Sequence, residues 1–327
     1  VGEGPGMKII EEREKNGPFT DIFDFIQRVD LHGVNKRILE ALARSGGFDS
    51  FTEIDRHQFF CLDEKENTFI ENLLKYGNSF QNDQLSTQQS LFGGNTEIEI
   101  PTPVIPVCQE WSKMYRLNQE KELIGIYLSA HPLDDYKFEI EHFCNTTLSD
   151  FSDLTSLQNK DISIAGIVTD VRHATTKNGK PYGNLTIEDY TDTYRITMFS
   201  KDYMDFKSYF TVGYFVMLKG KVQPRMFNEN ELEFKVQKMH MLSDVKENLI
   251  KNVKVKVPLS SINEGIIEEL RSLTETKKGN ALLNFVVYDP VDKISVQMFS
   301  RAGKIKVSDK FLEYLKKSTE IEFELSE

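Results

Sequence analysis

The sequence predicts a multidomain α+β protein, in which a helical domain, a polar linker and a connecting helix precede a five-stranded barrel and a small α/β domain. Three observations support this prediction. The chain has 327 residues, which is too long for one ordinary hydrophobic core. Apolar residues recur at helical spacing in several stretches before Leu128. Short β-branched and aromatic runs, which are typical of strands, begin near Ile162.

Residues 1–77 are expected to form a helical domain that begins inside a turn, so we expect the chain to be a piece of a larger protein. Residues 7–13 are predicted to form a helix after a glycine-rich turn, Gly2 to Gly6. Thr20 is a candidate N-cap for the next helix. Further helices are expected over 21–28, 35–44 and part of 57–77.

The glycine-rich turn is a candidate phosphate-binding site of the helix-hairpin-helix kind. The glycines Gly2, Gly4 and Gly6 would let backbone amides approach a DNA phosphate closely, and the following helix would present its positive N-terminal end. Lys36 and Arg37 could add phosphate contacts. The alternatives are an ordinary turn that joins two helices and two solvated charges.

Residues 78–108 are predicted to be a polar linker, rich in glutamine and without a sustained period. It contains a short amphipathic patch, Gln88-Gln89-Ser90-Leu91-Phe92. Leu91 and Phe92 are adjacent apolar residues in a polar context, which favours burial in the pocket of a partner. The alternative is that the two residues fold back onto their own domain.

A connecting helical segment is expected over 109–150. Its helical pattern runs from Gln109 to Leu128 and stops before Pro132, because the residue that precedes a proline disfavours helical backbone angles.

Residues 151–245 are expected to form the barrel. Short turns and one longer, helix-capable stretch at 201–213 separate five predicted strands. This number of strands and their spacing are typical of an OB fold, whose third and fourth strands are often joined by a helix, and an SH3-like barrel is the alternative. The predicted strands are 162–172, 182–190, 194–200, 214–223 and 231–242.

OB folds bind oligonucleotides with the loops that follow the first and fourth strands, where cations contact phosphates and aromatic rings stack on bases. The first loop also carries His173. Phe199 is ambiguous, since alternate residues of a strand face the core. The candidate DNA-binding residues of the barrel are Arg172, Lys177, Lys180, Tyr182, Arg195, Phe199, Arg225 and Phe227.

The last segment, residues 246–327, alternates strand, helix, two strands, helix and strand, which predicts a compact α/β domain.

The composition restricts the function classes. The net charge of −11 argues against a uniformly basic nucleic-acid binder, but residues 161–245 carry 11 basic and 11 acidic side chains and are neutral overall. No apolar run approaches the roughly 20 residues of a membrane helix. Cys61, Cys108 and Cys144 are widely spaced and odd in number, so we expect neither a disulfide nor a zinc site, and a cytoplasmic location.

The sequence contains no recognisable catalytic motif. The six histidines lack the HxH and HExxH spacings, and neither a P-loop nor a GxSxG sequence occurs. Glu188 and Asp189 are adjacent on a predicted strand and would point to opposite faces. We therefore expect no active site, no metal and no cofactor, and an enzyme is the least favoured of the possible functions.

Taken together, these motifs resemble the C-terminal region of the bacterial DNA polymerase III alpha subunit, the replicative polymerase of the C family. The most specific match is EKELIGIYLSAHPL at 120–133, preceded by Trp111, where Ala130 replaces a common glycine. Similar sequences are VGEG, NGPFTDIFDF, VNKRILEALARSGGFD and KNGKPYGNLTIED. The resemblance covers nearly the whole chain.

The resemblance implies a helix-hairpin-helix domain on duplex DNA, lacking its first helix here, and an OB domain near the single-stranded template. It also implies that Gln88, Ser90, Leu91 and Phe92 bind the sliding clamp and that the C-terminal domain binds the tau subunit of the clamp loader. The parent is a DNA-directed DNA polymerase, a nucleotidyltransferase, whose palm carboxylates lie upstream of this chain. The chain alone is expected to be inactive. The alternative is that the OB domain is a structural or protein-interaction module without DNA contact.

Overall fold

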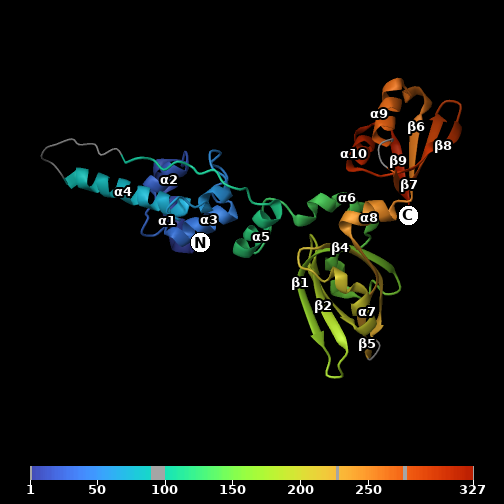
Figure 1. The fold of residues 1–327 in the computed structure, drawn as a ribbon, viewed down its shortest axis with the longest axis horizontal. Coiled ribbons are helices and arrows are strands. Elements are labelled where there is room, and N and C mark those ends of the chain that lie inside the picture. Colours follow the sequence, from blue (N-terminus) through green and yellow to red (C-terminus); the bar gives the residue numbers. More distant parts are fainter. Residues whose placement is uncertain (1, 90–99, 226–227, 275–277, 327) are drawn as a thin grey trace. The chain divides into compact units, whose positions relative to one another are not determined.

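The computed structural model describes residues 2–89, 100–225, 228–274 and 278–326, and the chain forms two compact units, Val1–Pro132 and Leu133–Glu327 (Figure 1). The first unit is helical and the second contains two sheets. The predicted multidomain α+β class is confirmed. The finer domain boundaries expected from the sequence remain predictions.

Capping side chains determine where several helices of the first unit begin. The carboxylate of Asp21 accepts hydrogen bonds from the backbone N–H groups of Phe23 and Asp24, both at 2.8 Å, so Asp21 is the N-cap and the prediction of Thr20 was wrong. Gly46 ends α3 with φ of 85°. The elements are α1 (Glu3–Asn16), α2 (Ile22–Arg28), α3 (Lys36–Ser45), the 3-10 helix η1 (Arg56–Phe60), α4 (Phe69–Gln89) and α5 (Lys113–Ile124).

Two helices extend beyond the residues expected from the sequence. Helix α4 continues to Gln89, although a linker was predicted from residue 78. Residues 78–89 contain neither proline nor glycine, so nothing in the backbone interrupts the helix. Helix α1 begins at Glu3, so Gly4, Pro5 and Gly6 are part of the helix and do not form a turn before it.

The core of the first unit is built around phenylalanines. The ring of Phe48 lies 5.1 Å from that of Phe25 and 5.2 Å from that of Phe59, between centroids, and all three residues are buried. Burial of each such side chain stabilises the fold by roughly 1.5–3 kcal/mol. These contacts join α2, the loop after α3 and η1 in one core.

A buried ion pair joins η1 to α5. Arg56 Nη1 lies 2.7 Å from Glu120 Oε1, and the two side chains are only 4% and 0% exposed. Arg56 also forms an ion pair with Asp49. The second carboxylate oxygen of Glu120 accepts the backbone N–H groups of Leu128 and Ser129, at 2.9 and 3.0 Å. Glu120 therefore fixes both α5 and the chain that follows it.

These contacts keep the buried Glu120 ionised. Burial alone would raise its pKa, but the two amides and Arg56 outweigh burial and lower the pKa to about 2. An unfolded glutamate titrates near its ordinary value of about 4.3. Between these two values the unfolded chain binds more protons than the folded one, so this stabilisation is lost as the pH falls toward 2.

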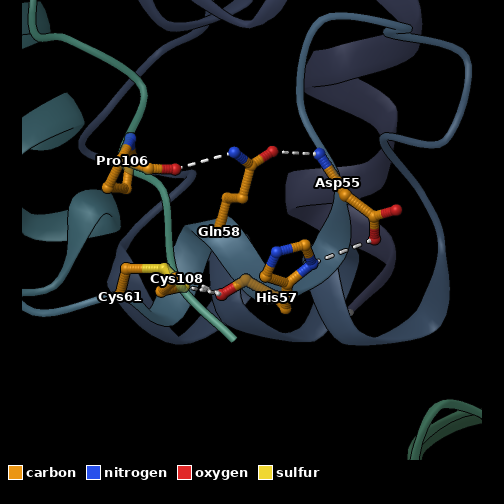
Figure 2. The surroundings of a disulfide bond; sticks show 6 residues. All are labelled: Asp55, His57, Gln58, Cys61, Pro106 and Cys108. Atoms are coloured by element: carbon orange, nitrogen blue, oxygen red, sulfur yellow. Dashed lines mark hydrogen bonds and ion pairs between the residues drawn. A yellow bond between two sulfur atoms is a disulfide. The ribbon is translucent and has the colours of Figure 1, made fainter. Parts of the chain in front are cut away.

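Cys61 and Cys108 form a disulfide, with Cα atoms 6.2 Å apart (Figure 2). The expectation that no disulfide forms was therefore wrong. The two cysteines are 47 positions apart, but the segment before α5 returns to η1, where Gln58 Nε2 donates a hydrogen bond to the carbonyl of Pro106 at 2.7 Å. Cys144 is free, and burial raises its pKa to about 12.

The second unit contains the predicted barrel. Its five antiparallel strands pair in the order β3-β2-β1-β4-β5, around a core of aliphatic and aromatic side chains. Sequence and structure agree on all five strands and on the helix after the third. The elements are β1 (Asp161–Thr175), β2 (Pro181–Glu188), β3 (Thr193–Phe199), α7 (Ser200–Phe206), η4 (Lys207–Tyr209), β4 (Phe215–Arg225) and β5 (Asn228–Met241).

The C-terminal part folds into a four-stranded sheet with the order β8-β7-β6-β9. Strands β6 and β7 are parallel and joined through α9, which is the usual crossover connection. Leu270, Phe311 and Leu315 of the two helices pack on the sheet. The elements are β6 (Asn252–Pro258), η5 (Leu259–Ser261), α9 (Glu264–Thr274), β7 (Lys278–Asp289), β8 (Ile294–Ile305), α10 (Asp309–Lys317) and β9 (Glu322–Ser326).

Strand β8 is an exposed apolar edge. It is the last strand of its sheet, and Ile294, Val296 and Met298 share one face of it. Their exposed fractions are 61%, 56% and 46%, and Phe299 on the other face is 71% exposed.

Three short helices precede β1: η2 (Pro132–Tyr136), α6 (Lys137–Phe143) and η3 (Leu148–Asp153). Helix α8 (Leu242–Leu249) connects the two sheets. Lys246 of α8 forms ion pairs with Glu139 of α6, at 2.9 Å, and with Asp309 of α10. One cation thus links three helices. None of the described helices has the length and hydropathy of a membrane span.

We predict that Glu120→Gln destabilises the first unit by about 3 kcal/mol, because the buried Arg56 would lose its buried partner and keep only the partly exposed Asp49. Urea unfolding of the full chain, followed by the fluorescence of Trp111, measures this change, since Trp111 is the only tryptophan. Between about pH 5 and pH 2, the stability of the variant should fall less than that of the parent chain, because the carboxylate that titrates there is removed. Glu122→Gln, an exposed change on the same helix, is the matched control; an equal effect there would contradict the prediction.

Candidate nucleic-acid interface

Four of the eight predicted DNA-binding residues of the barrel lie on the outer face of β1, β2 and β3. Along β2, Gly183, Leu185 and Ile187 are buried, so Tyr182 and Asn184 face outward. The strand register extends this face over all three strands. The rows of paired residues are Ala174-Tyr182-Phe199, Arg172-Asn184-Thr197 and Asp170-Thr186-Arg195.

Tyr182 and Phe199 form an aromatic platform on this face. Their rings stack with centroids 5.5 Å apart and planes at 24°, and Phe199 is 53% exposed. The sequence did not decide whether Phe199 faces the core or the solvent, and the structure places its side chain on the outer face. An exposed, flat aromatic surface of this kind can stack on a nucleic-acid base.

Cations flank the platform. Arg172 and Arg195 are exposed in the two rows beside it. Arg172 Nε lies 3.8 Å from the Asp170 carboxylate, which is a long and exposed contact. Lys177 and Lys180 are exposed in the turn between β1 and β2. Figure 1 shows this turn at the tip of a hairpin that projects beyond the rest of the barrel. The face therefore offers positive charge on both sides of the aromatic rings.

The loop between β4 and β5 supports the prediction less well. Arg225 lies 2.5 Å from Glu231 and 3.8 Å from Glu233, so two carboxylates already compensate its charge. Phe227 lies outside the described residues. Arg225 is consequently a weaker phosphate-binding candidate than the cations around the platform.

A hydrogen bond between Thr197 and Asn184 adds polar groups to the face. The hydroxyl of Thr197 donates to the side-chain carbonyl of Asn184 at 2.8 Å, which leaves the Asn184 amide directed at other partners. Neither Thr197 nor Asn184 was expected from the sequence to belong to the interface. The alternation from Tyr182 would have found Asn184, but Thr197 required the pairing register.

His173 belongs to the inner side of the same hairpin. Its Nδ1 lies 2.8 Å from the hydroxyl of Tyr203, and its ring packs near Phe210. Gly183 is opposite His173, and a Cβ atom at this glycine would lie 2.6 Å from the Tyr203 ring and 2.7 Å from the Phe210 ring. The absence of a side chain at Gly183 thus lets β2 cross these two rings.

The glycines at the start of the chain are arranged differently from the expectation. Gly2 is the N-cap of α1, and Gly6 donates its N–H to the carbonyl of Gly2 at 3.2 Å. Pro5 has no N–H. The backbone donors left at the start of the helix are those of Glu3 and Gly4, so a phosphate would meet a helix end and not a glycine loop.

Lys36 and Arg37 differ in their surroundings. Lys36 lies 2.9 Å from Glu71 and 3.9 Å from Glu40, and the hydrogen bond with Glu71 raises its pKa. Arg37 is exposed at the start of α3. Of the two, Arg37 is the better candidate for a phosphate contact.

The structure gives little information on the predicted clamp-binding peptide. The backbone of Gln88 belongs to α4, whereas Ser90, Leu91 and Phe92 lie outside the described residues. Their role stays a prediction.

The carboxylates of the barrel have structural roles in the described residues. Asp189 accepts hydrogen bonds from the N–H groups of Thr191 and Leu148, both at 2.7 Å, and so fixes the turn after β2. Among the residues that the structure describes, no group of three or more His, Cys, Asp or Glu side chains could hold a metal ion.

Three known families match separate parts of the chain. A helix-hairpin-helix motif matches residues 1–59, an OB-fold nucleic acid binding domain matches 162–242, and the C-terminal domain of the DNA polymerase III alpha subunit matches 253–326. The fold and these matches define a multidomain chain that combines a helix-hairpin-helix region and an OB-fold nucleic acid binding domain with a C-terminal α/β domain.

Curated DNA polymerase III alpha subunits are similar to almost the whole chain. That of Vibrio cholerae is 25% identical over 97% of this chain and 26% of its own length, and that of Borreliella burgdorferi is 31% identical over 82% and 22%. The Escherichia coli K12 protein is 25% identical over 99% and 28%. The chain spans about a quarter of these relatives. It is homologous to the C-terminal part of bacterial DNA polymerase III alpha subunits.

Gly183→Ala should destabilise the barrel by about 2 kcal/mol, because the new methyl group would overlap the rings of Tyr203 and Phe210. Thermal unfolding followed by circular dichroism measures the effect. Asn184→Ala, on the outer face of the same strand, is the control and should change stability by less than about 0.5 kcal/mol. Equal stability of the Gly183→Ala variant and the parent chain would show that β2 is not held against these rings.

Proposed function

We propose that the chain is the non-catalytic C-terminal part of a replicative DNA polymerase alpha subunit, and that it binds template DNA and tethers the polymerase to the sliding clamp and the clamp loader. The observation that carries the proposal is the exposed Tyr182–Phe199 platform between cations on the outer face of the barrel. We propose that the chain carries out this function in the bacterial cytoplasm. Nucleotide incorporation by this chain alone would contradict the proposal.

The barrel face suits single-stranded DNA. Unpaired bases expose their flat faces, and stacking on an aromatic side chain contributes roughly 1–3 kcal/mol per base without sequence preference. Arg172, Arg195, Lys177 and Lys180 would contact the phosphates. These few positive charges act locally, so they can attract a strand even though the whole chain is acidic.

The helical unit is proposed to contact duplex DNA. The free N–H groups of Glu3 and Gly4 and the exposed Arg37 support a backbone contact that does not read sequence.

The protein contacts are proposed from the homology. Gln88, Ser90, Leu91 and Phe92 would bind the sliding clamp, and residues 246–327 would bind the tau subunit of the clamp loader. The exposed apolar edge of β8 supports a protein partner for the last domain, since such surfaces often mark interaction sites. Weak contacts with DNA, clamp and clamp loader would reinforce one another by raising effective concentrations.

Phe199→Ala should weaken the binding of a labelled oligothymidine about ten-fold, because one stacking surface is lost. Fluorescence anisotropy with the full chain measures the dissociation constant. The triple change Lys177→Ala, Lys180→Ala and Arg195→Ala should reduce the slope of log affinity against log salt by about 2.

Two controls accompany this experiment. Arg225→Ala should have a smaller effect, because Glu231 and Glu233 already compensate that charge. Lys310→Ala with Lys317→Ala, outside the barrel, should have none. Unchanged binding in the Phe199 and triple variants would favour the alternative, in which the barrel is a structural or protein-interaction module.

Leu91→Ala combined with Phe92→Ala should abolish retention of the chain on an immobilised sliding clamp, because the apolar anchor of the peptide is removed. The control is Gln84→Ala with Gln89→Ala, which leaves all of the proposed clamp-binding residues unchanged: Gln88, Ser90, Leu91 and Phe92. Full retention of the Leu91 and Phe92 variant would show that the clamp binds elsewhere or not at all.

A further inference from the structure

Residues 100–111, named here the returning segment, lie against η1 with few contacts. Gln58 Nε2 donates to the carbonyl of Pro106 at 2.7 Å (Figure 2). Trp111 stacks on Phe60 with ring centroids 5.2 Å apart. In contrast, Val104 and Val107 are 88% and 96% exposed. Ile100 and Ile105 of the segment pack, partly buried, against the core of the first unit. Beside these non-covalent contacts, the covalent bond to Cys61 is the strongest restraint on the segment.

The two cysteines of this bond differ in accessibility. Cys61 is buried, with 7% of its surface exposed, whereas Cys108 is an exposed residue of the returning segment. Both sulfur atoms lie near the carbonyl of His57, at 3.6 Å for Cys61 and 4.0 Å for Cys108 (Figure 2). Cys108 is therefore the more accessible of the two residues to a small thiol from solution.

We propose that Cys61 and Cys108 form a reversible thiol–disulfide exchange site, which reacts at Cys108 with low-molecular-weight thiols and disulfides and thereby releases or fixes the returning segment. The inference rests on the helical unit alone and does not require DNA or clamp binding. Its chemistry follows from the accessibility of the two sulfur atoms.

In the opening reaction, a thiolate from solution attacks Cys108 Sγ, the bond to Cys61 breaks, and Cys61 leaves as a thiolate that takes a proton from water. A second small thiolate then attacks its partner sulfur in the mixed disulfide and releases the Cys108 thiolate. The balance is one protein disulfide and two small thiols giving two protein thiols and one small disulfide. Closure is the reverse, with the small disulfide as the two-electron oxidant.

The bond closes a loop with a sequence separation of 47, which contains α4 and the Gln88–Phe92 motif. When it is closed, the C-terminal end of this stretch is fixed beside η1. When it is open, only the Gln58 and Phe60 contacts and a small apolar area hold the segment. In a compartment that keeps thiols reduced, the open form predominates, and an oxidising shift closes the loop.

The first test compares the full chain in reduced and oxidised glutathione. Reduction should speed amide hydrogen exchange in residues 101–110 at least about ten-fold and make Trp111 more accessible to iodide quenching. The double variant Cys61→Ser, Cys108→Ser should behave like the reduced chain in both buffers. Cys144→Ser should keep the response, since Cys144 lies outside this site. Equal exchange in both buffers, or no Cys61–Cys108 bond in the oxidised chain by mass spectrometry, would overturn the proposal.

The second test uses single variants, whose modification does not depend on the fold of the double variant. Oxidised glutathione should add to Cys108 in the Cys61→Ser chain, and it should leave Cys61 largely unmodified in the Cys108→Ser chain. Equal modification of the two would refute the asymmetry. A negative clamp pull-down has no bearing on either test, since neither contains the clamp.

Discussion

The buried pair of Arg56 and Glu120 is the constraint on which the helical unit depends. The two side chains are only 4% and 0% exposed, so separation of α5 from η1 would take a buried charge away from its partner. The same carboxylate holds the amides of Leu128 and Ser129, which fixes the chain beyond the helix. The disulfide and the Trp111 contact secure the part before the helix. Four interactions thus hold residues 100–129 in place: the ion pair, the hydrogen bonds to the two amides, the disulfide and the Trp111 contact.

Along β2 and β3, alternation of the side chains separates the residues that stabilise the barrel from those proposed to bind nucleic acid. Residues such as Leu185 and Ile196 fill the core, and their neighbours Asn184 and Arg195 are left for the outer face. The platform of Tyr182 and Phe199 therefore needs no strained backbone and no buried charge. Its rings are already stacked before any ligand arrives, so few rotamers have to be ordered on binding.

Local patterns predicted the elements well, and contacts between distant residues explain the errors. The five strands, the C-terminal α/β order and the helix that ends at Gly46 follow from period, turn residues and caps. The ion pairs of Arg225 and the proximity of Cys61 to Cys108 require the fold, because their partners come from other strands or from residues far along the chain. The early start of α1 shows that Pro5 within the first turn does not prevent a helix. The clamp-binding role of residues 88–92 stays a prediction from the sequence, because residues 90–92 lie outside the described part of the chain.

The open edge of β8 has a consequence for how the chain behaves at high concentration. Unpaired N–H and C=O groups beside apolar side chains can add strands from other molecules and start aggregation. A net charge of −11 opposes this through mutual repulsion of the molecules. Acidity, which argued against a general nucleic-acid binder, thereby acts as colloidal protection. The repulsion weakens as the pH approaches the isoelectric point near 5.2, so it no longer opposes association through β8 there.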